Sequence, residues 1–402
     1  MAEFTLESFF TPDIIADPYP MYAGLRESNP ALYVPQNNLM VLSEYAHVQQ
    51  ALRSRDLGHT DGPDVTPEQM EEILANPALA SLRNTLLLMN PPDHTRIRAL
   101  MVKAFDAKRV EAMRERISAI AHGLIDKFVD AGGGDLVALF NHPFPVIVIC
   151  DMLGIPAEDQ AQFTSGTRIS GRLIDPTPMS AEELQQANES SSASAAYFTA
   201  LCDARRQDPQ DDLLTALVES ETEHGKLSRD ELTANISLLF AAGHETTVNL
   251  LGNSLLALYR NRDQLELLKT QPEHINTAVE EFLRYDSSVQ LSGRGALVDT
   301  EVAGHQIPAG TQIITLLAAA NRDPKSFSNP ERLDITRNEA KPLSFGGGIH
   351  LCLGAQLARM ETRIGITALL ERLPELELVN IHEPDWKQTI TLRGQKSIPA
   401  TW

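Results

Sequence analysis

Residues Phe345–Gly354, which read FGGGIHLCLG, form the most informative segment of this chain. Three consecutive glycines permit positive φ angles and a close approach of the backbone to another group. Cys352 follows them, just before a helical pattern that spans 353–373 and stops at Pro374. Free N–H groups at a helix start stabilise an anion, so a thiolate is favoured here. Gly354, which has no Cβ, would let a flat group pack against the start of the helix.

The other two cysteines are interpreted differently. Cys150 and Cys202 lie far from Cys352, and no two cysteines form a CxxC pair. This sparse, odd set argues against a disulfide framework and against a zinc ribbon, so we interpret Cys150 and Cys202 as buried packing residues. The Cys352 segment also lacks the GxGxxG and GxxxxGK patterns of phosphate-binding loops. Its specialised flanking residues therefore single out Cys352 as a functional cysteine.

The composition excludes several classes of protein. Hydrophobic residues make up 43% and charged residues 22% of the 402 residues, as in globular proteins. The formal net charge of -20 disfavours nucleic acid and anionic membrane surfaces as partners. The first residues do not form a secretory signal, and no run of eighteen apolar residues predicts a spanning helix. We expect a soluble, cytoplasmic monomer.

The hydrophobic pattern predicts a mainly α protein made of one compact domain, residues 1–402, with a small strand-rich lobe. Asn90 is expected to cap a helical region that continues to about residue 129, and Ser228 and Glu231 form a capping box before a helix that ends near Tyr259. Other helices are expected at 17–27, 44–53, 146–153, 158–171, 181–206, 211–221, 272–285 and 353–373. Strands are expected at 31–34, 39–42 and within 294–314, a hairpin at the C-terminus, and irregular structure at 56–89 and 322–350.

A second informative segment, Ala241–Thr247, lies in the middle of the long helix and reads AAGHETT. Glycine is unfavourable there by about 0.8–1 kcal/mol relative to alanine, and threonine can bond back to the carbonyl four residues earlier. Together they predict a locally opened helix that makes room for a ligand. His244 has no second histidine four residues later, so we interpret it as a packing residue rather than a zinc ligand.

The FGGGIHLCLG segment resembles the haem-binding signature of the cytochrome P450 superfamily, and every position of that signature is met. The resemblance extends over nearly the whole chain and implies the family fold, a mostly helical triangular prism with a smaller β lobe. It further implies haem b as cofactor and Cys352 as the thiolate ligand of its iron, with Phe345, Gly354 and Ala242 beside the porphyrin.

By the same resemblance, further residues acquire expected roles. Glu245 and Thr246 match the acid–alcohol pair that relays protons to dioxygen. Basic residues at family positions are expected to bind the haem propionates: His94, Arg98, Arg294 and His350. A buried network that supports the cysteine segment is expected from Glu281, Arg284 and Arg332. Side chains expected to face the substrate are Leu238, Ala241, Ala242, Val289 and Leu291, with 56–89 and 163–190 at the entrance.

These features predict a monooxygenase that uses dioxygen to oxidise an apolar small molecule. Terpenoid or steroid, polyketide-macrolide and fatty-acid substrates all stay open. Electrons would come from a separate ferredoxin-type protein. We expect it to dock at residues 94–116, which contain seven Arg or Lys residues but only three acidic ones. The alternatives are a peroxide-driven hydroxylase or decarboxylase, whose relatives replace the acid–alcohol pair, and a non-enzymatic haem sensor or carrier, which needs no proton relay.

Overall fold

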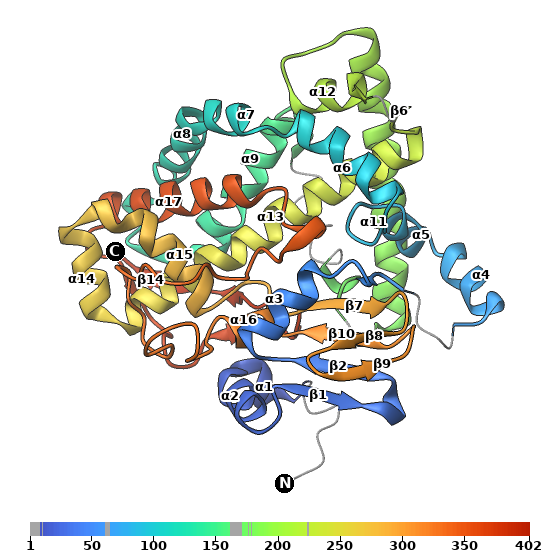
Figure 1. Cartoon of the computed structure of the whole chain (residues 1–402). Coiled ribbons are helices and arrows are strands. Elements are labelled where there is room, and N and C mark those ends of the chain that lie inside the picture. Colours follow the sequence, from blue (N-terminus) through green and yellow to red (C-terminus); the bar gives the residue numbers. More distant parts are fainter. Residues whose placement is uncertain are drawn as a thin grey trace.

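The structure is a computed structural model that describes residues 9, 11–60, 65–160, 171–175, 177, 179–222 and 225–402. It has a large helical part and a smaller β lobe, in which the strands of the five-stranded sheet lie together at one side of the molecule (Figure 1). This arrangement confirms the predicted mainly α class with a strand-rich lobe. Within the described residues, no helix is both long enough and apolar enough to cross a bilayer.

The helices account for most of the ordered chain. Their bounds are α1 Pro12–Ala16, α2 Tyr19–Ser28, α3 Tyr45–Arg53, α4 Pro67–Ala75, α5 Pro77–Arg83, α6 Asp93–Ala104, α7 Ala107–Ala112, α8 Arg114–Ile125, α9 Pro143–Leu153, α11 Ala181–Gln207, α12 Leu213–Glu219, α13 Arg229–Arg260, α14 Arg262–Thr270, α15 Ile275–Tyr285, α16 Leu317–Ala320 and α17 Ala355–Arg372. Short turns of other helix types are η2 Pro35–Asn37, η3 Val129–Ala131, η4 Val137–Asn141, η5 Pro272–His274 and η6 Gly348–His350.

The main sheet has five strands in the order β1-β2-β10-β7-β3. Its members are β1 Ala31–Val34, β2 Leu39–Leu42, β10 Gln312–Thr315, β7 Ser292–Ala296 and β3 Leu57–Gly58. The smaller sheets use β4 Gly133–Asp135, β5 Glu221–Thr222, β6 Gly225–Lys226, β8 Thr300–Val302, β9 His305–Ile307, β11 Glu377–Leu378, β12 Asp385–Trp386, β13 Gln395–Ser397 and β14 Pro399–Thr401. Strands β1 and β2 have the predicted bounds, and β12 pairs antiparallel with β13 near the C-terminus.

Helix α13 runs through the middle of the helical part and contacts α9, α11, α15 and α17 (Figure 1). The predicted capping box is present, because the Glu231 N–H donates to Ser228 Oγ and the Ser228 N–H donates to the Glu231 carboxylate. With 32 residues, the helix is about 48 Å long at 1.5 Å per residue. It therefore crosses the whole domain and can place side chains deep inside it.

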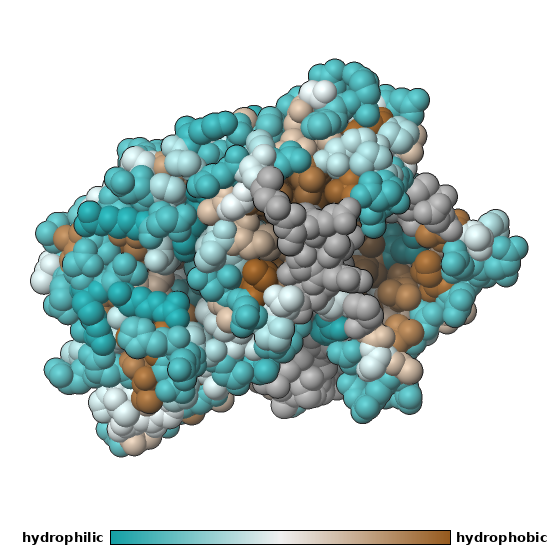
Figure 2. Space-filling model, turned by 90° about the horizontal axis from the view of Figure 1, so that it is seen from below, coloured by the Kyte–Doolittle hydropathy of each residue, from teal (hydrophilic) through white to brown (hydrophobic). Residues whose placement is uncertain are grey.

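The apolar core is divided between the two parts of the molecule. In the helical part, Phe144 of α9, Leu251 of α13 and Ile366 of α17 belong to one large buried cluster. In the β lobe, Val48 of α3 packs with Met40 and other strand residues in a second cluster. On the face shown in Figure 2, hydrophilic residues dominate and apolar residues form only small, separate patches.

Two expectations about the region before α6 are wrong. The described part of 56–89 is not irregular throughout, because β3, α4 and α5 lie there. The prolines at 67 and 77 each occupy a first helical turn, where proline is tolerated, and Thr66 caps α4 in a capping box with Gln69. Asn90 does not cap α6, since its side chain instead bonds to the backbone of His59. The helix expected over 158–171 lies mostly outside the described residues.

Candidate haem-binding and oxygen-activation site

The cysteine loop, residues 345–352, is closed by backbone hydrogen bonds. The Cys352 N–H donates to the Phe345 carbonyl at 3.0 Å, and the Gly346 N–H donates to the Leu343 carbonyl at 2.8 Å. Gly346 and Gly348 adopt φ angles of 68° and 63°, a region that strongly favours glycine. A Cβ on Gly348 would lie 2.2 Å from the carbonyl oxygen of Leu52 in α3. The glycines thus let the loop turn tightly against the β lobe.

Cys352 lies just before the N-cap of α17, as predicted, and its side chain is accessible to solvent. The surrounding protein atoms raise the pKa of its thiol, whereas an N–H of Gly354 and the positive charges of Arg98 and Arg359 lower it. Arg359 also lies over the Phe345 ring, 4.5 Å from its centroid. A Cβ built on Gly354 would meet nothing within 4 Å. The sulfur therefore has cationic support and open space on the side of Gly354.

Basic side chains from four separate segments gather near the cysteine loop. The rings of His94 and His350 lie 4.3 Å apart, and those of His59 and His350 lie 4.9 Å apart. Arg98, one turn after His94 in α6, donates from Nη2 to the Leu351 carbonyl at 2.6 Å. Arg294 is buried and donates to its own strand β7. We call these five residues the cationic ring: His59, His94, Arg98, Arg294 and His350.

The cationic ring gathers two arginine charges and three unpaired imidazole nitrogens at one place. Burial, followed by the positive charges of their neighbours, lowers the pKa of His59 and His94 to about 4 and that of His350 to about 2. Burial alone lowers the pKa of Arg294 to about 10. The Nε2 atoms of all three histidines are buried and have no hydrogen-bond partner among the described residues. A group with two carboxylates would satisfy this cluster, and the haem propionates are such a group.

His59 was missed by the sequence analysis. It follows β3, and Asn90 holds its backbone from both sides: the His59 N–H donates to Asn90 Oδ1 at 2.9 Å, and Asn90 Nδ2 donates to the His59 carbonyl at 2.7 Å. A lone histidine 35 residues before His94 carries no local signal. Only the fold brings it to His350.

The face of α13 that carries Thr246 presents small residues. Ala242 is exposed, and Leu238, Ala241 and Thr246 are half-buried. The Thr246 hydroxyl donates to the Ala242 carbonyl at 2.8 Å, as predicted. The expected local opening is absent, because α13 is continuous from residue 229 to residue 260. Gly243 instead faces α9, where a Cβ would lie 3.2 Å from Ile149 Cδ1.

The Glu245 carboxylate makes no direct hydrogen bond with the Thr246 hydroxyl among the described residues. This buried carboxylate accepts from Lys387 Nζ at 2.5 Å. His244, the preceding residue, is a buried packing residue, as predicted: its Nδ1 lies 3.0 Å from the Phe240 carbonyl. Consecutive residues on an α-helix project about 100° apart, so the acid and the alcohol point to different surroundings.

Of the two expected substrate residues after α15, one is enclosed. Val289 is half-buried and forms an isolated β-bridge with Leu392. Leu291 is only 7% exposed and belongs to the buried cluster that contains Leu316 and Ile390. Its side chain therefore has no free face for a substrate, which corrects the sequence-based assignment.

The expected network around Glu281 is present, but with a different second arginine. Arg284 donates from Nε and Nη2 to the Glu281 carboxylate at 2.7 and 2.8 Å. Arg337 Nε donates to the same carboxylate at 3.0 Å. Arg332 was the wrong choice, because its side chain is 69% exposed and only its backbone carbonyl accepts from Arg284. The two arginines lie in one loop, and sequence spacing alone does not tell which of them turns inward.

The loop after this network leads directly to the cysteine loop. Asn321 accepts from the Leu343 N–H at 2.7 Å and donates to Ser344 Oγ at 2.8 Å. Ser344 Oγ donates in turn to the Leu283 carbonyl in α15. Through these contacts α15 holds the segment that precedes Phe345 in place.

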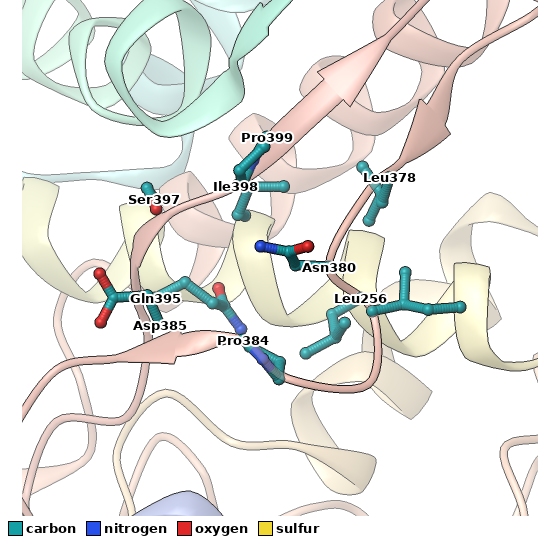
Figure 3. A pocket seen from close by; sticks show the side chains of 10 residues that line it. Leu256, Leu378, Asn380, Pro384, Asp385, Gln395, Ser397, Ile398 and Pro399 are labelled. Atoms are coloured by element: carbon teal, nitrogen blue, oxygen red, sulfur yellow. The ribbon is translucent and has the colours of Figure 1, made fainter.

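One small pocket lies away from these residues. It has a volume of about 30 Å³ under the C-terminal strands (Figure 3). Leu256, which lines it, follows Thr246 by about 15 Å along α13 at 1.5 Å per residue. Its other labelled lining residues are Leu378, Asn380, Pro384, Asp385, Gln395, Ser397, Ile398 and Pro399. A space of this size suits a water molecule rather than a substrate.

A cysteine before a long helix, an open glycine beside it and a cationic ring that could bind two carboxylates together fit a haem-thiolate protein. Comparison with known proteins gives the family. The cytochrome P450 family model matches residues 30–274 and 271–395. The chain therefore belongs to the cytochrome P450 family, and it is a monooxygenase whose cofactor is haem b.

Three relatives illustrate the similarity. The vitamin D(3) 25-hydroxylase of Pseudonocardia autotrophica is 39% identical over 96% of this chain and 94% of that protein. The cytochrome P450 monooxygenase PikC of Streptomyces venezuelae is 37% identical over 97% of this chain and 92% of that protein. The crystal structure of P450BioI with hexadec-9Z-enoic acid ligated acyl carrier protein has a TM-score of 0.90 and 32% identity, covering 98% of this chain and 100% of that one.

Proposed function

We propose that the protein inserts one atom of dioxygen into an apolar small molecule, with Cys352 as the thiolate ligand of the haem iron. The observation that carries the proposal is the convergence of the cysteine loop and the cationic ring, in which the buried Nε2 atoms of three histidines have no hydrogen-bond partner among the described residues. When bound, haem supplies the iron that activates dioxygen, and a thiolate ligand favours cleavage of the O–O bond. The chain's own residues hold the propionates, orient the substrate and deliver protons.

The residues proposed to bind the propionates are His94, Arg98, Arg294 and His350, joined by His59. Because they are buried or half-buried, an anion among them is poorly screened by solvent. Phe345, Ala242 and Gly354 are proposed to border the porphyrin. Glu281, Arg284 and Arg337 would support the cysteine loop without contact with the reacting atoms.

The proposed substrate is apolar because the residues assigned to its binding face carry no charge: Leu238, Ala241, Ala242 and Val289. Thr246, on the same face of α13 as Ala242, is the proposed hydroxyl that donates toward bound dioxygen. The names of the relatives include a vitamin D(3) hydroxylase and a complex with a fatty acid on an acyl carrier protein. These support a steroid-like or fatty-acid-like substrate, with polyketide-macrolides as a third class.

Electrons are proposed to come from an acidic ferredoxin-type protein that docks over α6 and the cysteine loop. Val102, Ile349 and Leu351 are exposed apolar residues there, at 45%, 45% and 47%. The surrounding basic residues are partly engaged already, in ion pairs Arg96–Glu231, Arg109–Asp211, Arg114–Glu111 and Arg116–Asp151. An apolar centre with a cationic rim is complementary to an acidic partner.

The function is tested with purified haem-loaded protein. The ferric protein is titrated with vitamin D3, hexadecenoic acid and a macrolide, and the Soret band is followed for the shift that accompanies loss of iron-bound water. The compound that shifts it is then incubated with NADPH, a surrogate ferredoxin and its reductase under oxygen-18. One oxygen-18 atom in the product is expected. Product formed equally well from peroxide without dioxygen would overturn the oxygen-dependent reaction.

A further inference from the structure

Lys387 reaches Glu245 from the other end of the chain. It follows β12, and its backbone N–H donates to the Gly394 carbonyl at 2.9 Å. Its Nζ donates to Glu245 Oε1 at 2.5 Å and to Asn249 Oδ1 at 2.7 Å. Asn249 lies one turn after Glu245 on α13. The ammonium therefore bridges two successive turns of the helix that carries Thr246.

The segment that carries Lys387 is packed tightly against α13. A Cβ on Gly394 would lie 2.1 Å from Asn249 Oδ1, so only glycine allows this approach. A Cβ on Gly252 would likewise lie 2.4 Å from Gln395 Oε1. Nearby, Asn253 donates to the Arg393 carbonyl at 3.1 Å. The position of Lys387 over Glu245 is thus imposed by close packing of the 393–395 segment against this buried part of α13.

The ion pair is largely removed from solvent. The side chains of Lys387 and Glu245 are 19% and 10% exposed. His244 Nε2 lies 4.0 Å from Glu245 Oε2, but burial lowers the pKa of His244, so that ring favours its neutral form. Among the described residues, Lys387 is therefore the cation that compensates the Glu245 carboxylate. A buried charge that loses its partner is strongly disfavoured.

We propose that Lys387 is a positioning residue for proton delivery, since its ammonium holds the Glu245 carboxylate at the turn of α13 next to Thr246. This inference rests on the proposed oxygen-dependent function. Lys387 itself does not contact substrate or oxygen. It acts through Glu245, which would accept protons from solvent and pass them toward the Thr246 side of the helix. Without the lysine, the carboxylate would lose both its charge compensation and its orientation.

The test compares K387M and K387R with K396M in the haem-loaded protein. Lys396 lies on β13 of the same antiparallel pair, 3.3 Å from Asp385, and its side chain is 49% exposed. We expect K387M to lower product formed per NADPH by about ten-fold, less than the roughly 10²–10⁴-fold of a direct general acid or base because Lys387 acts through Glu245, and to raise peroxide release and the solvent deuterium isotope effect. K387R, which keeps the positive charge, should retain most of the coupling, and K396M should match the unmodified protein.

Unchanged coupling and isotope effect in K387M would overturn the inference, and so would an equal loss in K387R. A double-mutant cycle of K387M and E245Q, followed by thermal unfolding, tests the ion pair without turnover. The effects of the two substitutions should be non-additive, and additive effects would also overturn the inference. The proposed function fails separately, if the unmodified protein itself incorporates no oxygen-18 into any compound that shifts its Soret band.

Discussion

The imidazole rings of His59 and His350 meet edge to face with their centroids 4.9 Å apart, next to the cysteine loop. His59 is fixed there by the side chain of Asn90, which bonds to both its N–H and its carbonyl. Within the part of the chain that the structure describes, neither histidine has a partner for its buried Nε2. The pair therefore places two unpaired, buried ring nitrogens among the residues proposed to bind the haem propionates.

If His59 holds a propionate, H59A should weaken retention of haem. We expect the transfer of haem to apomyoglobin to become about ten-fold faster, a loss typical of one hydrogen bond to a charged group. H305A is the matched control, because His305 is exposed on β9. A transfer rate equal to that of the control would remove His59 from the proposed site.

Substitution of the proposed iron ligand should change the spectrum of the protein. In C352H the red-shifted Soret band of the reduced carbon monoxide complex should disappear, because a neutral nitrogen would replace the thiolate. C202A should retain the band, since Cys202 is buried and its surroundings raise the pKa of its thiol to about 11. Persistence of the band in C352H would assign the ligand to another residue.

Thr246 should be required for coupled turnover but not for assembly of the site. T246A is expected to keep haem and substrate binding, and to divert at least about 90% of the reducing equivalents to peroxide, since general acid–base contributions are about 10²–10⁴-fold. S254A is the control, because Ser254 makes the same bond to the carbonyl four residues earlier, two turns further along α13. Normal coupling in T246A would count against a role for this hydroxyl.

The two arginines of the 332–337 loop should differ sharply in their contribution to stability. R337M leaves the Glu281 carboxylate short of a buried partner, so we expect a loss of about 3–5 kcal/mol in the free energy of unfolding. R332M removes an exposed side chain and should change that free energy by less than about 0.5 kcal/mol. Chemical denaturation measures both, and equal losses would restore Arg332 to the network.

Glu361 of α17 should make stability depend on pH. It is buried, and this burial raises the pKa of its carboxyl well above 4.5, while Thr247 acts in the opposite direction. The folded state then keeps a proton that the unfolded state has lost, so stability falls as pH rises from about 4.5 through the raised pKa.

E361Q removes this dependence. The substituted protein should gain stability relative to the unmodified one as the pH rises above about 4.5, at no more than about 1.4 kcal/mol per pH unit. E371Q, at an exposed position of the same helix, should show no such gain. If the free energy of unfolding changed with pH in the same way in the unmodified protein and in E361Q, the prediction of a raised Glu361 pKa would be contradicted.

The local elements of the fold follow closely from the sequence. Strands β1 and β2, the capping box of α13 and the cysteine loop each depend on neighbouring residues, and each was predicted. The predictions were wrong where one residue type can have either of two structural roles. The prolines at 67 and 77 start helices rather than break the chain, and Asn90 binds a distant backbone rather than capping its own helix.

The sequence by itself determined the haem-thiolate class. A tight loop before a cysteine and a helix depends on neighbouring residues, and the three adjacent glycines that allow it can be read directly in the sequence. The tertiary structure alone decided that His59 joins the cationic ring, that Arg337 rather than Arg332 faces Glu281, and that Lys387 holds Glu245. These contacts join side chains that are remote in the chain or compete within one loop. Their partners depend on how whole elements pack, which no local pattern encodes.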